Sequence, residues 1–140
     1  MDHYKKVIVA IDIFSEHQKV LERAQKLANS PEDLTLIYAT LPQLYFESYG
    51  YSLGTDFISD NQKNANEALV TLAQKHDIPD GQVFAPIGDP ADEIHALAER
   101  LEADLIVVGT HGKSGLKLLL GSTANAVLHG AKCDVLAVKI

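Results

Sequence analysis

Five short apolar runs, separated by segments with helical spacing, constrain the fold of this chain most strongly. The runs are rich in β-branched residues and lack the apolar-polar alternation of half-buried strands, so they are typical of strands buried on both faces of a parallel sheet. They occupy Val7 to Ile11, Leu34 to Thr40, Gln82 to Pro86, Asp104 to Gly109 and Val135 to Ile140.

The segments between these runs carry apolar residues at i, i+3, i+4 and i+7, which gives each predicted helix one apolar stripe to cover a sheet face. The stripes are Val20, Leu21, Ala24, Leu27 and Ala28, then Ala65, Ala68, Leu69, Leu72 and Ala73, then Ile94, Leu97, Ala98 and Leu101. Asp89 and Pro90 suit the N-cap and first position of the third helix. A fourth helix is expected from Ser122 to His129, with Gly130 ending it in the left-handed conformation.

Strands and helices therefore alternate along the whole chain, and this order predicts an α/β fold. We expect a doubly wound five-stranded parallel sheet with strand order 3-2-1-4-5, right-handed crossovers and helices on both faces. A length of 140 residues suits a single domain over residues 1–140.

Composition excludes several classes of function. The chain has 12 Lys and Arg against 19 Asp and Glu, a formal net charge of −7, which argues against a dedicated binder of nucleic acid or anionic membranes. Cys133 is the single cysteine, so no intrachain disulfide is possible. The apolar runs are far shorter than the roughly 20 residues of a membrane span, and the first is too short for a secretory signal. A cytoplasmic location is expected.

The segment from Leu41 to Asp60 does not fit the simple alternation. It holds Tyr45, Phe46, Tyr49, Tyr51 and Phe57, five of the nine aromatic residues in the chain. One interpretation is a long loop whose rings cover the sheet edge. The other is a flap over a ligand pocket.

The glycine-rich segment from Gly109 to Thr123 follows the fourth strand and leads into a helix. Ligands of open α/β sheets bind at the carboxyl ends of the strands. Glycines let the backbone approach a ligand, and hydroxyls at the start of a helix add donors at the positive end of its dipole. The segment is therefore predicted to hold a phosphate group.

Two common phosphate motifs are excluded. A Walker A loop ending in Gly112-Lys113-Ser114 requires glycine where Val107 stands. A Rossmann fingerprint requires glycines after the first strand, where the chain has Asp12-Ile13-Phe14-Ser15.

Other chemistries find little support. The six histidines include no pair four residues apart, and there is no Cys-x-x-Cys, so a dedicated metal site is not expected. A G-x-S-x-G elbow for nucleophilic catalysis is absent. A receiver domain would need several acids at the end of the first strand, where Asp12 stands alone. Cys133 fits a small packed residue better than a reactive thiol.

At the glycine-rich segment the chain resembles the universal stress protein (UspA) family, whose nucleotide-binding members carry G-x2-G-x9-G-[ST]. Gly109, Gly112, Gly121 and Ser122 match this motif, with eight residues between Gly112 and Gly121 in place of nine. The resemblance extends over essentially the whole chain. It includes the run from Val7 to Asp12, the second strand, Gly88-Asp89-Pro90 and the stretch from Cys133 to Val138.

The resemblance implies a site for ATP. Adenine would pair with backbone groups near Ala39, and the base and ribose would meet Ala10, Ile11 and Asp12. The phosphates would lie on Gly109, beside Val108, and on Gly112, Gly121, Ser122 and Thr123. Mg²⁺ bound with ATP would use Asp12 as an indirect ligand.

Asp12 and the two neighbours of Gly112, which are His111 and Lys113, are further candidates for the site that also allow a simpler interpretation. Asp12 could cap the following turn or helix. His111 and Lys113 could contact a phosphate, or they could be solvated loop residues.

Two functional hypotheses follow. The first is an ATP-binding switch or sensor in a stress response, with slow hydrolysis at most and an unidentified protein partner. The second is an interaction dimer without nucleotide, in which the shorter spacing is merely a connection. In both, the last strand is expected to form a homodimer, because an apolar edge strand invites pairing and because the family pairs this strand across a two-fold axis. The interface would contain Val135, Leu136, Ala137, Val138 and Ile140.

Overall fold

The computed structural model describes residues 3–13, 17–40, 55–110 and 117–140, and among these the side chains of residues 55–58 and 117–122 are not described. The strands are β1 (Val7–Ala10), β2 (Leu34–Ile37), β3 (Val83–Phe84), β4 (Leu105–Thr110) and β5 (Asp134–Lys139). The helices are α1 (Gln18–Leu27), α3 (Thr55–Lys75), α4 (Pro90–Leu101) and α5 (Lys117–Gly130), with 3-10 turns η1 (Pro31–Asp33) and η2 (Asp80–Gln82).

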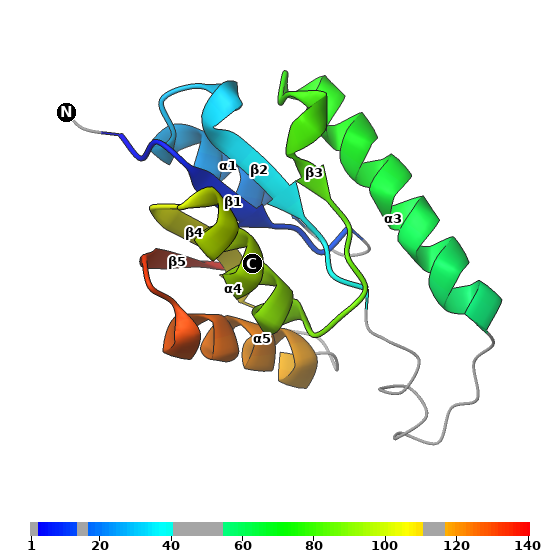
Figure 1. The fold of residues 1–140 in the computed structure, drawn as a ribbon. Coiled ribbons are helices and arrows are strands. Elements are labelled where there is room, and N and C mark those ends of the chain that lie inside the picture. Colours follow the sequence, from blue (N-terminus) through cyan, green and yellow to red (C-terminus); the bar gives the residue numbers. More distant parts are fainter. Residues whose placement is uncertain (1–2, 14–16, 41–54, 111–116) are drawn as a thin grey trace.

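The strands form one parallel sheet in the order β3-β2-β1-β4-β5 (Figure 1). This order confirms the predicted doubly wound topology. The chain moves outward from β1 to β3 and then returns to β4 on the other side of β1. The order therefore reverses between β1 and β4, which is where open α/β sheets bind ligands.

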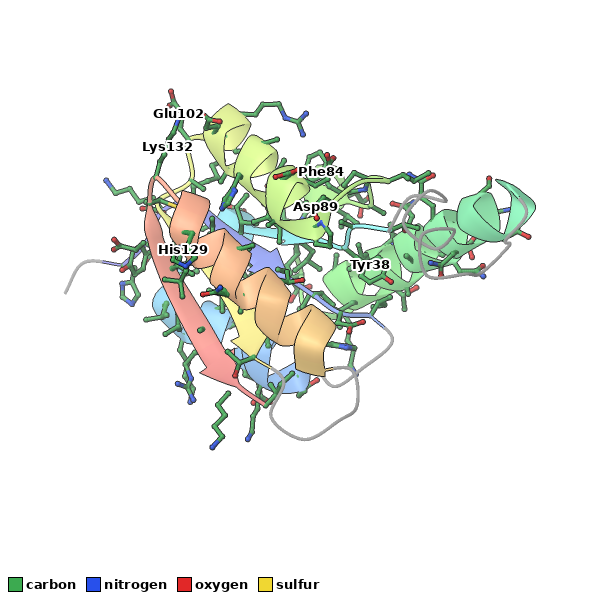
Figure 2. The ribbon with its side chains drawn as sticks, turned by 90° about the horizontal axis from the view of Figure 1, so that it is seen from below. Tyr38, Phe84, Asp89, Glu102, His129 and Lys132 are labelled. Atoms are coloured by element: carbon green, nitrogen blue, oxygen red, sulfur yellow. The ribbon has the colours of Figure 1, made fainter. Side chains whose placement is uncertain are left out.

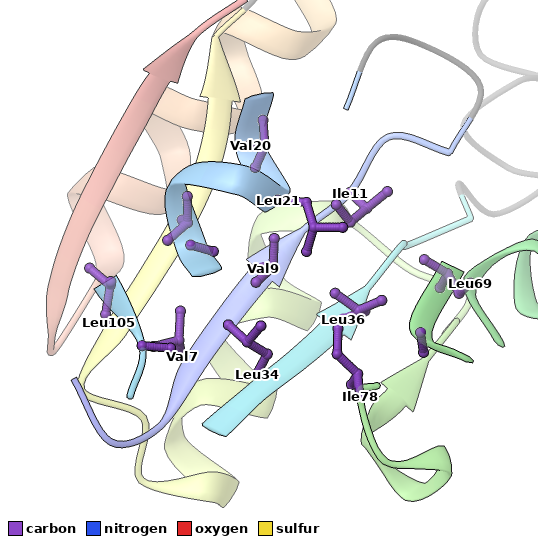
Figure 3. Packing of buried hydrophobic residues seen from close by; sticks show 14 of the residues in the cluster. Val7, Val9, Ile11, Val20, Leu21, Leu34, Leu36, Leu69, Ile78 and Leu105 are labelled. Atoms are coloured by element: carbon purple, nitrogen blue, oxygen red, sulfur yellow. The ribbon is translucent and has the colours of Figure 1, made fainter. Parts of the chain in front are cut away.

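Alternate residues of each central strand face opposite layers of helices. Val7, Val9, Leu105 and Val107 pack toward α1 and α3 (Figure 3), while Ile8 and Ile106 pack toward α4 and α5. Each of these side chains is at most 2% exposed, and full burial of such a side chain contributes about 1.5–3 kcal/mol. Burial on both faces explains why the strands read as continuous apolar runs.

Most strands are shorter than the apolar runs that predict them. β3 contains only Val83 and Phe84, because Gln82 ends the turn η2 and Pro86 has no N–H to donate. β2 ends at Ile37, yet Thr40 still forms an isolated bridge to Ile87. The sheet pairing thus continues past the ends of its regular strands.

The helices α1 and α4 agree with their predictions, whereas α3 begins much earlier than predicted. Asp89 caps α4 as predicted, accepting a hydrogen bond from the backbone N–H of Asp92 at 3.1 Å, with Pro90 at the first position. α3 begins at Thr55, so the loop predicted from Leu41 to Asp60 is wrong for its last six residues. The other residues of that segment, 41–54, lie outside the described residues. Among the described residues, no helix is both long and apolar enough to cross a membrane.

The predicted boundaries of the last helix are wrong at both ends. α5 begins at Lys117 rather than at Ser122. The sequence Lys-Leu-Leu-Leu at residues 117–120 consists of strong helix formers. The neighbouring glycines had suggested a loop there. Gly130 belongs to α5, and its φ lies outside the left-handed region. Its lack of a side chain has another reason: a Cβ there would collide with Cε1 of His95 on α4.

Candidate functional site at the carboxyl edge of the sheet

The sheet brings the ends of three strands together at its carboxyl edge. Ala10 lies level with Ile37 of β2 on one side and with Val108 of β4 on the other. Asp12, Ala39 and Gly109 follow these three aligned residues within one or two positions. The parallel register therefore places the predicted contacts for base, ribose and phosphate at the same edge.

Burial differs among these residues. Ile11 and Val108 are 3% and 4% exposed, so their side chains belong to the core and only their backbones face the edge. Ala10, Asp12, Ala39 and Gly109 are half-buried. The N-cap position of α1 is taken by His17 rather than Asp12.

Tyr38, near the end of β2, is the titratable group most affected by this edge. Burial and the nearby carboxylate of Asp12 raise the pKa of its hydroxyl, and a hydrogen bond from Asn61 of α3 acts in the opposite direction. Tyr38 lies against α3 in Figure 2. The Tyr38 hydroxyl is thus affected both by the charge of Asp12 and by an amide of α3.

A second hydrogen bond joins α3 to the sheet beside Tyr38. Nε2 of Gln62 donates to the backbone carbonyl of Ala85 at 2.7 Å, just past the end of β3. Both Asn61 and Gln62 are half-buried. The early turns of α3 therefore contact the carboxyl edge through amide side chains.

Thr40 has the one buried hydroxyl at this edge that lacks a hydrogen-bond partner among the described residues. The residue is 0% exposed. Its backbone is satisfied, because its N–H donates to Pro86 and its carbonyl accepts from Gly88, both at 2.8 Å. Leaving a buried hydroxyl unpaired costs on the order of 1–3 kcal/mol.

Gly109 has a packing role in addition to any ligand role. A Cβ there would lie 3.0 Å from Cγ2 of Val20 on α1 and 3.2 Å from Cδ1 of Ile140. The residue also pairs with Val138 of β5. The packing of Val20 and Ile140 around β4 thus leaves little room for a side chain at this position.

The remaining predicted phosphate contacts are only partly described. His111, Gly112 and Lys113 lie outside the described residues. Gly121 and Ser122 are within α5, and Thr123 is half-buried and has an interaction partner. Because α5 begins at Lys117, the N–H groups that lack intrahelical partners belong to the first turn of the helix and not to residues 121–123.

A cavity of about 260 Å³ lies at the opposite end of the molecule, between the carboxyl ends of α4 and α5. Its lining includes His95, Cys133 and the ion pair between Lys132 and Glu99, whose Nζ and Oε1 are 2.8 Å apart. Figure 2 shows Lys132 beside Glu102 at this end. Burial and the nearby carboxylates of Asp134 and Asp104 raise the pKa of the Cys133 thiol, which disfavours a reactive thiolate.

Sequence reasoning missed the contributions of Tyr38, Thr40, Asn61 and Gln62. Tyr38 and Thr40 stood inside an apolar run and were assigned to a buried strand. Asn61 and Gln62 precede the apolar stripe of their helix, so periodicity gave no sign of them. Among the described residues, no group of three His, Cys, Asp or Glu could hold a metal ion.

Comparison with known proteins agrees with the fold. The family model described as "Universal stress protein family" matches residues 3–139. The chain belongs to the universal stress protein family. It is 40% identical over 143 residues to universal stress protein A homolog 2 of Coxiella burnetii, and the match covers 100% of this chain and 98% of that one.

Solved structures of the family share the fold. One, reported as a structure-based assignment of the function of hypothetical protein MJ0577, matches with a TM-score of 0.67 and 25% identity over 99% of this chain and 98% of that one. Another, a universal stress protein in complex with cAMP, matches with a TM-score of 0.56 and 28% identity over 99% and 98% of the two chains.

Proposed function

We propose that this universal stress protein binds ATP at the carboxyl edge of its sheet. The observation that carries the proposal is the register that brings Asp12, Ala39 and Gly109 to one edge at the reversal of strand order. The segment of residues 109–123 continues from that edge into α5. A universal stress protein of the same fold was crystallised with cAMP, which supports an adenine nucleotide as the class of ligand.

The site would work as a nucleotide-dependent switch or sensor. Asp12 is the described carboxylate at the edge that could orient a magnesium-bound water, since Mg²⁺ bound to ATP keeps several waters and uses few protein ligands. We assign no residue as a base that activates water, so hydrolysis is expected to be slow or absent.

The first test is mass spectrometry of the supernatant from freshly purified, denatured protein, followed by calorimetric titration with ATP and Mg²⁺. ATP or ADP carried through purification, or micromolar binding, is the expected result. Absence of both carried-over nucleotide and binding heat at two temperatures would contradict the proposal.

A pair of variants then locates the site. Gly121→Asp adds a side chain and a negative charge in the segment of residues 109–123, and we expect it to abolish the rise in melting temperature that ATP causes. Gly81→Asp adds the same charge in η2, where a Cβ would meet nothing within 4 Å. An equal loss in both variants would place the ligand elsewhere.

The alternative function is an interaction dimer that binds no nucleotide. A dimer through β5 is expected under both functions, and the contrast between the two sheet edges favours β5 as the place of contact: β5 is a six-residue strand, whereas β3 has two residues and is followed shortly by Pro86. Val138 is 4% exposed, but Ala137 is exposed and Val135, Leu136 and Ile140 are half-buried. Such an edge offers unpaired backbone groups to a second copy.

Light scattering of full-length variants tests the dimer. Ala137→Glu would place like charges close together if two β5 strands pair, and we expect it to yield monomers. Leu128→Glu, at a 54% exposed position on α5, serves as the matched control. Dissociation by Leu128→Glu and not by Ala137→Glu would move the interface from β5 to the surface of α5.

A further inference from the structure

The cavity between the carboxyl ends of α4 and α5, which we call the α4–α5 cavity, lies at the end of the molecule opposite to the proposed nucleotide site. Its volume is about 260 Å³, which is smaller than the roughly 300–1,000 Å³ of pockets for drug-sized ligands. Ala98, Ala103 and Ile106 supply the apolar part of its lining. Of these residues, Ala98 and Ile106 are 9% and 0% exposed. The cavity therefore suits a small ligand with a short apolar part.

His95 adds a hydrogen-bond acceptor to this lining. Its Nε2 donates to the carbonyl of Val127 at 2.8 Å, so Nδ1 of the neutral ring carries a lone pair and no proton. Nδ1 has no hydrogen-bond partner among the described residues, and it is not one of the buried atoms that lack a partner, so it is accessible. A donor group on a ligand can therefore bond to Nδ1, whereas an acceptor group cannot.

The ends of both helices make the α4–α5 cavity electrostatically negative. The last carbonyl groups of a helix lack intrahelical partners and carry about half a negative elementary charge. α4 ends at Leu101, with Glu102 as its C-cap, and α5 ends at Gly130. The carboxylates of Glu99 and Glu102 add full negative charges to the lining, against one ammonium group, that of Lys132. The lining thus favours a cation over an anion.

The side chain of Lys132 is itself a primary amine on an aliphatic stem, and it already contacts one of these carboxylates. Its Nζ lies 2.8 Å from Oε1 of Glu99, at the end of the molecule where Figure 2 shows Glu102. The side chains of Lys132 and Glu99 are 78% and 61% exposed, and an ion pair that is so exposed is weak. A free amine can therefore replace Lys132 on Glu99 at little cost.

We propose that the α4–α5 cavity is a second ligand site, which binds a small primary aliphatic amine. The ammonium group takes the place of Lys132 on Glu99 and donates a further hydrogen bond to Nδ1 of His95. His95 and Glu99 are four residues apart on α4, so their side chains are neighbours on one face of the helix. The alkyl part of the ligand packs on Ala98 and Ile106. This site does not depend on whether ATP binds at the carboxyl edge.

NMR titration of the isotope-labelled, full-length protein in phosphate buffer tests the class of ligand. Butylamine, butanol and pentanoate carry the same butyl chain on a positive, a neutral and a negative head group. We expect butylamine to cause saturable shifts of the amides of residues 103 and 130–133. Butanol should bind at least about tenfold more weakly, because it lacks charge-assisted hydrogen bonds, and pentanoate should not bind.

Variants of exposed side chains test the position of the ammonium group. Lys132→Gln removes the competing cation and should strengthen butylamine binding by about two- to fivefold. Glu99→Gln removes the acceptor and should weaken binding by about the same factor. Glu67→Gln, on α3, makes the same charge change as Glu99→Gln and should leave binding unchanged. Because all three side chains are exposed, we expect the variants to fold.

Four results would overturn the amine site: no saturable shift with butylamine, butanol or pentanoate binding as tightly as butylamine, weaker binding in Lys132→Gln, or an equal loss in Glu67→Gln and Glu99→Gln. ATP is absent from these titrations, so each outcome is read independently of the proposed function.

Discussion

The imidazole ring of His95 on α4 occupies the space that a Cβ atom on Gly130 of α5 would need. The same ring donates a hydrogen bond from Nε2 to the carbonyl of Val127, 2.8 Å away. The two helices thus approach closely through one ring that is held in place by a hydrogen bond.

Gly130→Ala should therefore lower the free energy of unfolding by about 1–3 kcal/mol, the usual cost of forcing extra atoms into a packed site. The sign is informative, because alanine normally stabilises a helical position relative to glycine. Urea unfolding measures the change. In a His95→Ala background the cost should shrink, and an unchanged cost would exclude the ring as its source.

Asp104 joins the starts of β1 and β4. Its Oδ2 and Oδ1 accept the backbone N–H groups of Lys5 and Lys6, each at 2.9 Å. Asp104→Asn replaces one acceptor oxygen by a donor that faces another donor, so we expect a loss of about 1–3 kcal/mol in unfolding free energy. Asp80→Asn, at an exposed position on η2, removes the same charge and should have little effect.

Tyr38 should make the protein less stable at alkaline pH. Burial and Asp12 raise the pKa of its hydroxyl in the folded state, whereas the unfolded chain ionises near the ordinary value of about 10. Above that pH the unfolded state binds fewer protons than the folded state, so stability falls as pH rises and levels off above the folded pKa.

Unfolding free energies measured between about pH 8 and pH 11 test this expectation, because this range includes the ordinary pKa of tyrosine. Tyr38→Phe should show a shallower decline than the wild type. Tyr4→Phe is the comparison variant, because it removes a second tyrosine with a raised pKa. In Tyr4 the hydroxyl is exposed, and its hydrogen bond to Asp134 raises the pKa. Parallel curves for the wild type and Tyr38→Phe would contradict the assignment.

Asp89 should stabilise α4 through its cap. Asp89→Ala leaves the N–H of Asp92 without its side-chain acceptor, and such caps contribute about 0.5–2 kcal/mol. Asp89→Ser keeps an acceptor and should recover most of the loss in thermal or urea unfolding. If serine is no better than alanine, the carboxylate acts through the helix dipole rather than as a cap.

Local sequence signals were sufficient to predict the helices and strands that are determined by nearby residues. Asp89 and Pro90 mark the start of α4 because capping involves residues within one turn. Runs such as Val7 to Ile11 mark the central strands because burial on both faces leaves no polar position. The order of elements also gave the strand order, since right-handed crossovers leave few alternatives.

Long-range contacts determined the features that the sequence did not predict. The glycine at position 130 follows from His95, 35 residues earlier, and no local rule reports such a contact. α3 begins at Thr55 although its apolar stripe begins at Ala65, and the amides of Asn61 and Gln62 in its early turns find partners just past the ends of β2 and β3.

By itself, therefore, the sequence determined the α/β class, the sheet order and the family resemblance, since these depend on periodicity and motifs along the chain. Only the tertiary structure decided that Asp12 and α3 both affect the Tyr38 hydroxyl, that the buried Thr40 hydroxyl has no partner among the described residues, and that Gly109 packs against Val20. The physical reason is that burial, electrostatic environment and steric fit are properties of groups brought together from distant parts of the chain.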